Sequence, residues 1–387
     1  MPTDFDVIIA GGGLSGLFCA KELASKDLTV KVFEEHNKIG HPNKCSGVVS
    51  LGSLKKLGLF PLKRGLQNRF SKIMFHSPSD NSLTLNFNSL DILVLNRYEL
   101  DNFLSEEAVK SGATISISSR IEQVIEDKSS VEVKLRANET FSGEYLIDAR
   151  GVTSYKNKKG LYNGIQSYAF YKNFEWDHIH VFFDKRFAPG FFAWLIPIDE
   201  YNAKIGLASR GQPLECLRLF QNKIGVKNLF NIDMSPIIVG GPIEQFVEGR
   251  IIYVGDSAGQ TKPTTGGGIY FGGAASLLAS EAINIKKKDP SISLKERYEK
   301  KWFSKFKREV EYMKMARKYY EKMENDDIEK LFSIAKSSYS SQINLEMDYD
   351  FHMSSLVKAL GIKSFLSIAA NIFGSTVKDT LIDFIHQ

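Results

Sequence analysis

The chain has few cysteines and no pattern of metal ligands. Its three cysteines, Cys19, Cys45 and Cys216, form no CxxC pair. Neither a zinc site nor a disulfide framework is therefore indicated. The seven histidines are not paired at helical spacing, so we expect no metal site.

Long hydrophobic runs are also missing. No stretch approaches the ~18–20 apolar residues that a membrane-spanning helix needs. The first residues enter an apolar strand without a basic and then apolar leader. With 43% apolar and 25% charged residues among 387, the composition is that of an ordinary globular protein. We therefore expect a cytoplasmic location.

An excess of one charge occurs in one segment. The net charge is +5, and residues 286–322 hold 14 Lys or Arg against 6 Asp or Glu. Two interpretations stay open, a solvated helical face and attraction to anionic lipid head groups. The second would make the protein peripheral at the inner face of the membrane. Nucleic acid is not an expected partner, because no binding motif accompanies the charge.

A glycine-rich turn near the N-terminus indicates dinucleotide binding. Residues 5–10 form a short apolar run that suits a buried parallel strand. Gly11, Gly13 and Gly16 then complete GxGxxG, and residues 17–24 have a helical pattern. The glycines allow a tight turn, close approach of a pyrophosphate and close helix packing. The helix N-terminus adds free N–H groups and a partial positive charge.

The residues after this helix support the same interpretation and favour FAD over a nicotinamide cofactor. A second strand over 28–33 ends at Glu34, 21 residues after Gly13, where an acidic side chain holds a ribose. Residues 39–47 then form a polar, turn-rich loop. A nicotinamide dehydrogenase would usually continue into another helix at this point.

A second glycine-rich block follows much later in the chain. Residues 250–254 have a strand pattern that ends at Gly255 and Asp256, and three glycines at 266–268 precede a helix over 269–285. Small residues in this helix allow close approach of neighbouring backbone or cofactor. Its N-terminus would favour negative charge at the pyrimidine end of a reduced flavin. The two blocks together predict the two halves of one FAD site.

Three segments carry a family resemblance. Lys-Cys-Ser-Gly at 44–47, the run APGFFAWLIP at 188–197 and the Gly-Asp…Pro…Gly-x-Gly-Ile pattern at 255–269 form the set. This set resembles the geranylgeranyl reductase family, which includes archaeal digeranylgeranylglycerophospholipid reductases, over roughly residues 5–290. The resemblance implies an α/β fold of the glutathione-reductase-like, hydroxylase-type class. It also implies a Cys-containing loop beside the isoalloxazine.

The same family resemblance implies roles for individual residues. Arg97-x-x-Leu-Asp, which opens a helix over 97–110, resembles the arginine-bearing helix that faces FAD in such flavoproteins. An ordinary arginine at a helix N-terminus is the alternative. Asp256 matches the aspartate that binds a ribityl hydroxyl. Cys45 is a candidate for the protonation step or for shaping alkene approach, and a small buried residue beside the flavin is equally compatible.

The expected site contains cofactor and substrate contacts but no metal ligands. The expected substrate contacts are Phe170, Phe192, Trp194 and Pro197. The expected FAD contacts are Gly11, Gly13, Leu14, Ser15, Gly16, Glu34, Glu35, Cys45, Ser46, Gly47, Arg97, Val124, Gly255, Asp256, Gly266, Gly267, Gly268 and Ile269.

Aromatic residues are concentrated in the middle of the chain. Twelve lie among the 33 residues from Tyr162 to Trp194, in segments whose alternation predicts an antiparallel sheet over 167–174, 179–184, 191–197 and 204–209. Any one ring is more often core than ligand contact. Together, so many rings on one face of a sheet need another element packed against them, and an apolar ligand is a candidate for part of it. An isoprenoid chain would suit, with ~0.8 kcal/mol per buried CH₂.

These patterns divide the chain into three regions. A discontinuous Rossmann-like FAD-binding domain is expected over 1–75, 95–160 and 245–290. An inserted antiparallel-sheet substrate domain takes 76–94 and 161–244. A helical region follows over 291–387, with a basic helix at 294–324 and an apolar-rich one at 356–373. This region is either a cap on the core or a lid through which lipid enters.

Two departures from the family pattern bear on function. Arg150 stands where many relatives carry an aspartate linked to pyridine-nucleotide and FAD contacts. Direct use of NADPH is therefore in doubt, and ferredoxin or another reductant becomes a candidate electron donor. Residues 192–197 also come within one residue of the Trp-x-Trp-x-Ile-Pro signature of flavin-dependent halogenases, since Phe192 replaces the first Trp.

The leading hypothesis is an FAD-dependent oxidoreductase that reduces carbon–carbon double bonds of a geranylgeranyl or other polyprenyl chain in membrane-lipid biosynthesis. Reduced flavin would deliver hydride from N5, while the protein orients the alkene and excludes water. An oxygen-using halogenase or hydroxylase is one alternative. A redox-neutral flavoprotein cyclase or isomerase is the other.

Overall fold

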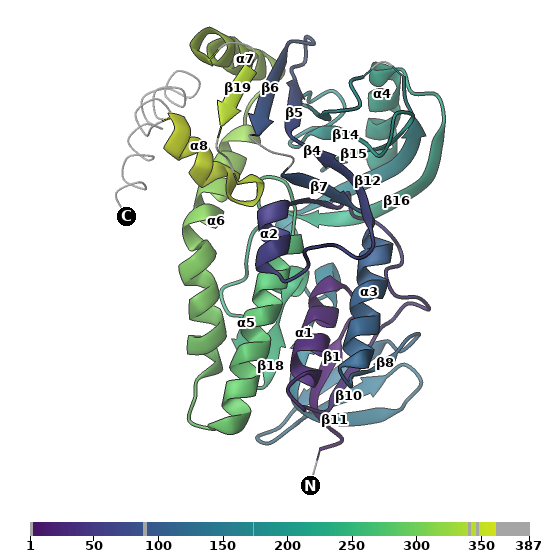
Figure 1. Ribbon diagram of the computed structural model, residues 1–387, viewed down its shortest axis with the longest axis vertical. Coiled ribbons are helices and arrows are strands. Elements are labelled where there is room, and N and C mark those ends of the chain that lie inside the picture. Colours follow the sequence, from purple (N-terminus) through teal and green to yellow (C-terminus); the bar gives the residue numbers. More distant parts are fainter. Residues whose placement is uncertain (1–2, 88–90, 173, 340–341, 346–347, 361–387) are drawn as a thin grey trace.

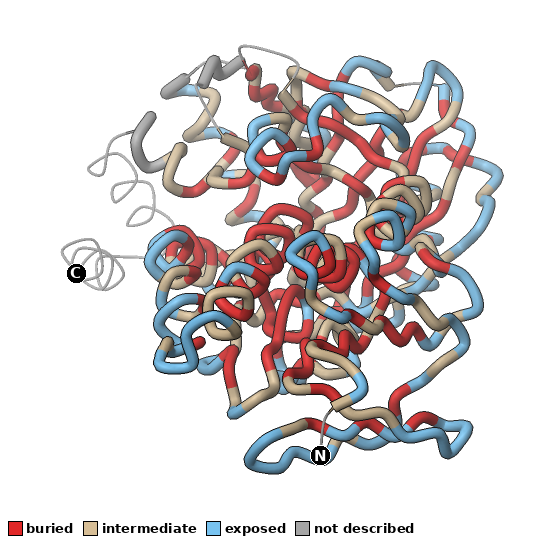
Figure 2. Tube along the Cα trace, turned by 60° about the horizontal axis from the view of Figure 1, so that its bottom comes forward, coloured by how far each residue is buried: buried red, intermediate tan, exposed pale blue. Residues whose placement is uncertain are grey.

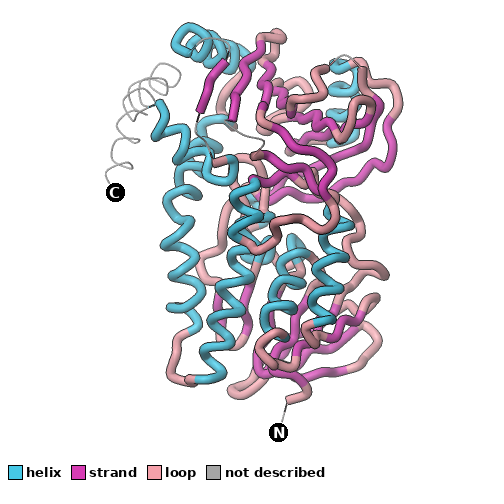
Figure 3. The backbone as a smooth tube through the Cα atoms, viewed as in Figure 1, coloured by secondary structure: helices cyan, strands magenta, loops and turns pink. Residues whose placement is uncertain are grey.

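The computed structural model describes residues 3–87, 91–172, 174–339, 342–345 and 348–360. Long helices and one sheet make up the end near the N-terminus, and a second sheet lies at the opposite end (Figures 1 and 3). Buried residues lie between sheets and helices, while exposed residues follow the outer loops (Figure 2). The predicted α/β fold with a second sheet and C-terminal helices is confirmed.

The first sheet is mainly parallel and of the dinucleotide-binding kind. Its strands are β1 (Phe5–Ala10), β2 (Val30–Phe33), β8 (Thr114–Ser116), β9 (Ile121–Glu126), β10 (Val131–Leu135), β11 (Thr140–Asp148), β17 (Val247–Glu248) and β18 (Ile251–Tyr253). The order is β17-β18-β11-β1-β2-β8, with β10 and β9 attached beside β11. Because β1 pairs in parallel with both β11 and β2, the turn after β1 lies at the middle of the carboxyl edge.

Three helices pack beside one another on this sheet. They are α1 (Leu14–Ala24), α3 (Arg97–Lys110) and α5 (Ile269–Lys288), and α1 contacts both of the others (Figure 1). Small residues make the approach of α5 to α1 close, since a Cβ at Gly272 would lie 2.8 Å from Oγ of Ser15. The helix predicted over 17–24 begins three residues earlier, and the one predicted over 269–285 extends to Lys288.

The second sheet carries the aromatic segment. Its strands are β5 (Lys72–His76), β6 (Ser82–Phe87), β12 (Leu161–Phe170), β13 (Ile179–Phe182), β14 (Ala193–Pro197), β15 (Asn202–Ser209), β16 (Leu229–Ile238) and β19 (Gln342–Leu345), in the order β16-β12-β15-β14-β13-β5-β6-β19. The pairs β13–β5 and β19–β6 are parallel, whereas the others are antiparallel. Both parallel pairs join strands that are far apart in sequence, so no hairpin imposes an antiparallel direction.

Smaller elements connect and cover the two sheets. Strands β3 (Val48–Ser50), β4 (Leu66–Phe70) and β7 (Ile92–Leu95) form a three-stranded sheet with order β3-β7-β4, and α2 (Leu51–Lys56) follows β3 directly. Helix α4 (Pro213–Ile224) buries Leu217 and Phe220 against the second sheet. Strand β5 begins at Lys72, so the domain boundary predicted after residue 75 falls within a strand of the second sheet.

The C-terminal region lies along α5 and reaches the second sheet. The basic helix predicted over 294–324 is a π-helical segment, Lys295–Lys300, followed by α6 (Lys301–Tyr320). Helix α7 (Asn325–Tyr339) comes next, and a 3₁₀ turn, Tyr349–Phe351, leads into α8 (His352–Leu360). Only the start of the apolar helix predicted over 356–373 lies within the described residues. None of the described helices is long and apolar enough to cross a membrane.

Candidate cofactor and substrate site

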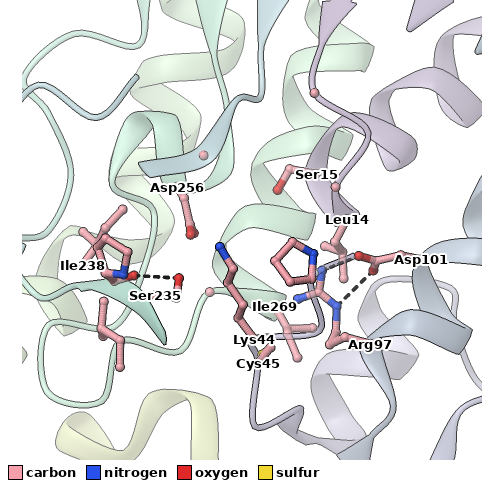
Figure 4. Close-up of a pocket in the computed structure, with 18 of the residues that line it drawn as sticks. Leu14, Ser15, Lys44, Cys45, Arg97, Asp101, Ser235, Ile238, Asp256 and Ile269 are labelled. Carbon is pink, nitrogen blue, oxygen red and sulfur yellow. Dashed lines mark hydrogen bonds and ion pairs between the residues drawn. The ribbon is translucent and has the colours of Figure 1, made fainter. Parts of the chain in front are cut away.

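A cavity of about 1040 Å³ lies between the carboxyl edge of the first sheet and one face of the second. Figure 4 shows Leu14 and Ser15 of α1, the Lys44–Cys45 loop, Arg97 and Asp256 converging on it from separate elements. The volume exceeds the upper range of typical small-ligand pockets, so it has room for a large cofactor together with a second molecule.

The first glycine-rich turn lines the cavity with backbone. Gly11 has φ of +107° and a Cβ there would lie 2.4 Å from the carbonyl oxygen of Ala149, so the turn requires glycine. Gly13 caps α1 without a side-chain hydrogen bond, and no atom lies within 4 Å of a Cβ built on it. The first amides of α1 therefore face open space, as binding of a pyrophosphate requires. Gly16 instead packs on the backbone of Gly11.

Two acidic residues follow β2 on the cavity wall. Glu34 is buried, and its Oε2 accepts a hydrogen bond from the amide of Gly12 at 2.7 Å, while Oε1 accepts one from the amide of His36 at 2.9 Å. Glu35 forms an ion pair with Arg120 at 3.4 Å. The backbone of the glycine-rich turn thus orients Glu34 at the position where a ribose-binding carboxylate is expected.

The second glycine-rich block lies directly against the first. Gly255 has φ of +64°, and a Cβ there would lie 2.3 Å from Oγ of Ser15. The hydroxyl of Ser276 on α5 donates to the carbonyl of Ser15 at 2.9 Å. Because these contacts join the N-terminus of α1 to the β18–α5 connection, the two blocks form one continuous wall.

Helix α5 points its N-terminus into the same cavity. Gly266, Gly267, Gly268 and Ile269 line it, and Gly268 caps the helix without a side-chain hydrogen bond. Asp256 projects into the space beside them (Figure 4). Burial raises the pKa of Asp256, and Arg97 opposes this change. Two helix N-termini and a carboxylate therefore face one space, which fits a ligand with anionic groups at two places.

A buried ion pair supports the Cys45 loop. Nε and Nη2 of Arg97 donate to the two oxygens of Asp101 at 3.0 and 2.9 Å. Burial opposes the charge on Arg97, but Asp101 and the neighbouring sulfur of Cys45 outweigh it and raise the pKa of the guanidinium. The sulfur also accepts a hydrogen bond from the amide of Gly47 at 3.3 Å. Cys45 is thus held beside Arg97 by the amide of Gly47, and both Cys45 and Arg97 line the cavity.

A fully buried lysine ties the second sheet to this loop. Lys204 on β15 donates through Nζ to the carbonyls of Ser46 at 3.0 Å and of Leu95 at 3.2 Å. Burial lowers the pKa of Lys204 to about 8, with Cys45 opposing and Arg97 reinforcing the shift. The ammonium therefore bridges the two domains beside the loop that carries Cys45.

Arg150 turns back toward Asp148, the last residue of β11. Its Nη2 donates to Oδ2 of the buried Asp148 at 2.6 Å, and Nε lies 3.2 Å from the same oxygen. The charge of Arg150 is thus largely balanced by Asp148. Both residues line the cavity.

The second sheet supplies an apolar wall. Trp194 on β14, Gly206 on β15 and Gln166 on β12 lie side by side in register. A Cβ at Gly206 would lie 2.5 Å from the indole ring of Trp194, so this glycine lets the ring lie flat across the sheet. Phe192, Ile179, Ile196 and Ile237 extend the same wall.

The structure brings most of the predicted site residues to this cavity. Those on its lining are Gly11, Gly13, Leu14, Ser15, Glu34, Glu35, Cys45, Ser46, Arg97, Asp256, Gly266, Gly267, Gly268, Ile269, Phe192 and Trp194. Gly16, Gly47 and Gly255 lie behind it, at positions where a Cβ would collide with backbone or with Ser15. Val124, Pro197 and Phe170 are not part of the lining, and Phe170 is 53% exposed beside Phe230.

Several lining or supporting residues carried no signal in the sequence analysis. Lys204 is one lysine among many, and Gln166 falls in a strand chosen for its aromatics. Asp148 stands two residues before Arg150 and belongs to no motif of the sequence. Tyr349 comes from the C-terminal region, which matched no motif, yet it lines the cavity. Only Asp101 had a visible signal, as the last position of the Arg97 pattern.

Fold and site together define a class of protein. Two glycine-capped helix N-termini, an oriented Glu34 and a cavity under a second sheet fit FAD. The match with known families agrees: a family described as FAD binding domain matches residues 4–204. The chain belongs to this FAD-binding family.

Two relatives are similar in sequence to this chain over most of its length. The chain is 28% identical over 377 residues to an uncharacterized protein of Methanocaldococcus jannaschii, covering 92% of this chain and 95% of that one. It is 29% identical over 366 residues to digeranylgeranylglycerophospholipid reductase 2 of Methanothermobacter thermautotrophicus, covering 88% and 94%.

A solved structure shares the whole fold. A geranylgeranyl bacteriochlorophyll reductase-like protein from Thermoplasma acidophilum superposes with a TM-score of 0.84 at 21% identity, covering 98% of this chain and 99% of that one. The resemblance predicted from the sequence is confirmed, and so are FAD as cofactor and membership among FAD-dependent oxidoreductases.

Proposed function

We propose that this protein reduces isolated carbon–carbon double bonds of a geranylgeranyl or similar polyprenyl lipid, as a step of membrane-lipid biosynthesis. The observation that carries the proposal is the cavity, whose first-sheet end fits FAD and whose second-sheet end is apolar. Relatives named digeranylgeranylglycerophospholipid reductase match along most of the chain and support this substrate class.

Different residues of the chain would bind the cofactor and the substrate. When bound, FAD in its reduced form supplies a hydride. The amides at the start of α1 would hold its pyrophosphate, and those at the start of α5 would face its pyrimidine end. Trp194 and Phe192 would hold the prenyl chain, each buried CH₂ contributing ~0.8 kcal/mol. We propose that Cys45 shapes the approach of the alkene, since its sulfur is fixed by Gly47 and Arg97.

A lipid substrate also implies encounter with a membrane surface. We propose that the basic segment over 286–322 provides attraction for anionic head groups, with Lys305 and Lys307 of α6 exposed for this purpose. The electron donor is a separate question. Because Arg150 is paired with Asp148, we expect a reductant other than NADPH to serve best.

The decisive experiment is an anaerobic turnover assay. Holoenzyme reduced with dithionite is incubated with geranylgeranyl phospholipid, and the products are weighed by mass spectrometry. A gain of two hydrogens per double bond is expected, without oxygen or halide. Unchanged mass with altered structure would instead point to a cyclase or isomerase, and product that forms only with oxygen would point to a hydroxylase or halogenase.

The halogenase alternative depends on a lysine facing the substrate space near Trp194. Lys204 has this location, because Lys204 and Gly206 project to the same face of β15 and Gly206 is paired with Trp194. Its ammonium, however, is bonded to the carbonyls of Ser46 and Leu95, and it is absent from the cavity lining. This arrangement favours the reductase.

A further inference from the structure

Reduction of an isolated alkene requires a proton as well as a hydride, and most ionisable groups on the cavity wall already have partners. Glu34 accepts from the amides of Gly12 and His36, and Asp148 accepts from Arg150. The sulfur of Cys45 accepts a hydrogen bond from the amide of Gly47 and lies close to Arg97. These groups are engaged with donors, and Asp256 lies beside the N-terminus of α5, on the cofactor side of the cavity. The proton source is therefore sought at the apolar end.

Tyr349 places a phenolic hydroxyl at that end. It lies in the 3₁₀ turn before α8, lines the cavity, and packs against the cluster that contains Trp194, Ile179 and Ile196. Burial and, more weakly, Asp350 and Cys45 raise the pKa of its phenol. The phenol thus meets the substrate space beside the residues proposed to hold the prenyl chain.

The position of Tyr349 is fixed from three directions. Nζ of Lys262 lies 3.9 Å from the centre of its ring. The same ammonium pairs with Asp350 at 2.9 Å, and Asp350 also accepts from the amide of Ser50 at 3.0 Å. His352 contacts the carbonyl of Tyr349 through Nδ1 at 3.1 Å. Ring and backbone are therefore both held, which is what a proton donor needs in order to act at one carbon.

We propose that Tyr349 is the proton donor in the reduction, and that Lys262 is its positioning residue. One alkene carbon receives the hydride, which reduced FAD supplies, and the other receives the phenolic proton. The π bond breaks, two C–H bonds form, the O–H bond breaks, and the tyrosinate regains its proton from water. Lys262 stabilises the transient tyrosinate charge from the face of the ring. This inference rests on the proposed reductase activity.

The protonation state of the phenol agrees with this role. Burial raises the pKa of Tyr349, Lys262 lowers it, and Asp350 and Cys45 raise it, so the balance lies above the ordinary tyrosine value. The acid form is the active one and is lost only as pH rises through this raised pKa. Tyr349 should therefore leave the rate independent of pH between about 7 and 9.

The test compares Tyr349→Phe with wild type and with Tyr171→Phe. Tyr171 is a matched control, because it is buried away from the cavity and its hydroxyl donates to the carbonyl of Asp199 at 2.8 Å. Holoenzymes are reduced with dithionite and given geranylgeranyl phospholipid in single-turnover and steady-state assays. The FAD content, melting temperature and substrate affinity of the oxidised forms are measured in parallel.

The expected result is a loss of at least ~100-fold in kcat for Tyr349→Phe with KM within about threefold, as for removal of a general acid. FAD content, melting temperature and substrate affinity should stay at wild-type values. Lys262→Arg, which keeps the charge, should retain more activity than Lys262→Met. A Tyr349→Phe enzyme that reduces at the wild-type rate overturns the assignment while the reductase function stands. A wild-type enzyme that reduces no prenyl substrate overturns both.

Discussion

At the scale of single residues, the glycines of the two glycine-rich blocks have different roles. Gly255 and Gly11 have positive φ and leave no room for a Cβ, so their replacement would disturb the fold itself. Gly13 has an ordinary backbone conformation and open space in front of it. Its small size is needed only by a ligand that approaches the backbone.

This difference predicts that Gly13→Ala separates stability from cofactor binding. The melting temperature of the FAD-free protein should stay within about 2 °C of wild type. Alanine is a poorer N-cap than glycine, but it also lowers the conformational entropy of the unfolded chain, and the two effects oppose each other. FAD affinity should fall at least ~10-fold, because the methyl group occupies the place of a phosphate. Isothermal titration of FAD-free protein with FAD measures the affinity.

Gly255→Ala serves as the contrasting variant. Its Cβ would lie 2.3 Å from Oγ of Ser15 at a φ of +64°, so a lowered melting temperature is expected before any cofactor is added. Equal FAD affinity in wild type and Gly13→Ala would contradict a pyrophosphate site at the start of α1.

At the scale of elements, α8 is held at its first turn by groups from two other parts of the chain. The amides of Met353 and Ser354 donate to the buried carboxylate of Glu309 on α6, each at 2.9 Å. His352 meets the hydroxyl of Thr264 through Nε2 at 2.8 Å. A carboxylate at a helix N-terminus satisfies free amides and complements the dipole, so the start of α8 is fixed where Tyr349 precedes it.

This environment predicts that stability falls in mild acid. Burial, followed by Lys262, lowers the pKa of His352 to about 4. The unfolded chain titrates near 6.5, so between these values it binds a proton that the folded protein does not. The free energy of unfolding should therefore be constant above about pH 6.5 and decrease as pH falls toward 4, by up to ~3 kcal/mol for this residue.

Urea unfolding at pH values from 4.5 to 7.5 measures this dependence. His76 has the same behaviour, since burial and His180 lower its pKa to about 4. The comparison is therefore between wild type and His352→Gln, whose slope below pH 6.5 should be shallower. An identical slope in the two proteins would show that folding does not lower the pKa of His352.

At the scale of the whole molecule, one buried ion pair joins the C-terminal region to the FAD-binding domain. Lys262 and Asp350 are 2% and 3% exposed, with Nζ 2.9 Å from Oδ1. Lys262 lies in the connection between β18 and α5, and its Cε would be 2.8 Å from a Cβ at Gly267. The pair thus couples the cofactor wall to the turn that carries Tyr349.

Removing one partner of this ion pair should lower the free energy of unfolding. Asp350→Asn leaves the Lys262 charge buried without a counterion, and a loss of ~3–5 kcal/mol in the free energy of unfolding is expected. Glu107→Gln is the matched control, because the Lys110–Glu107 pair at 2.8 Å is on the surface and should contribute far less to the free energy of unfolding. Chemical denaturation at pH 7 compares the two, and equal losses would contradict the role assigned to the buried pair.

Local signals were enough to predict the FAD-binding fold and the two glycine-rich turns that lie along the cavity. The strand, glycine turn, helix and acidic residue from Phe5 to Glu34 follow one another along the chain, and each has a residue pattern set by its own geometry. The same is true of the strand and helix around Gly255. The extent of the second sheet was underestimated at β5 and β19, because β5 pairs with β13 and β19 pairs with β6, strands distant from them in sequence.

The amino-acid sequence by itself therefore determined the FAD-binding fold and the glycine positions that line it. Only the tertiary structure decided which side chains support the chemistry. Lys204 bonds to a carbonyl 158 residues away, and Asp350 accepts from an amide 300 residues away. Such pairs leave no periodic or spaced pattern, because their energy depends on burial and distance, which exist only once the chain has folded. Tyr349 likewise lies at the cavity only because of tertiary contacts of this kind.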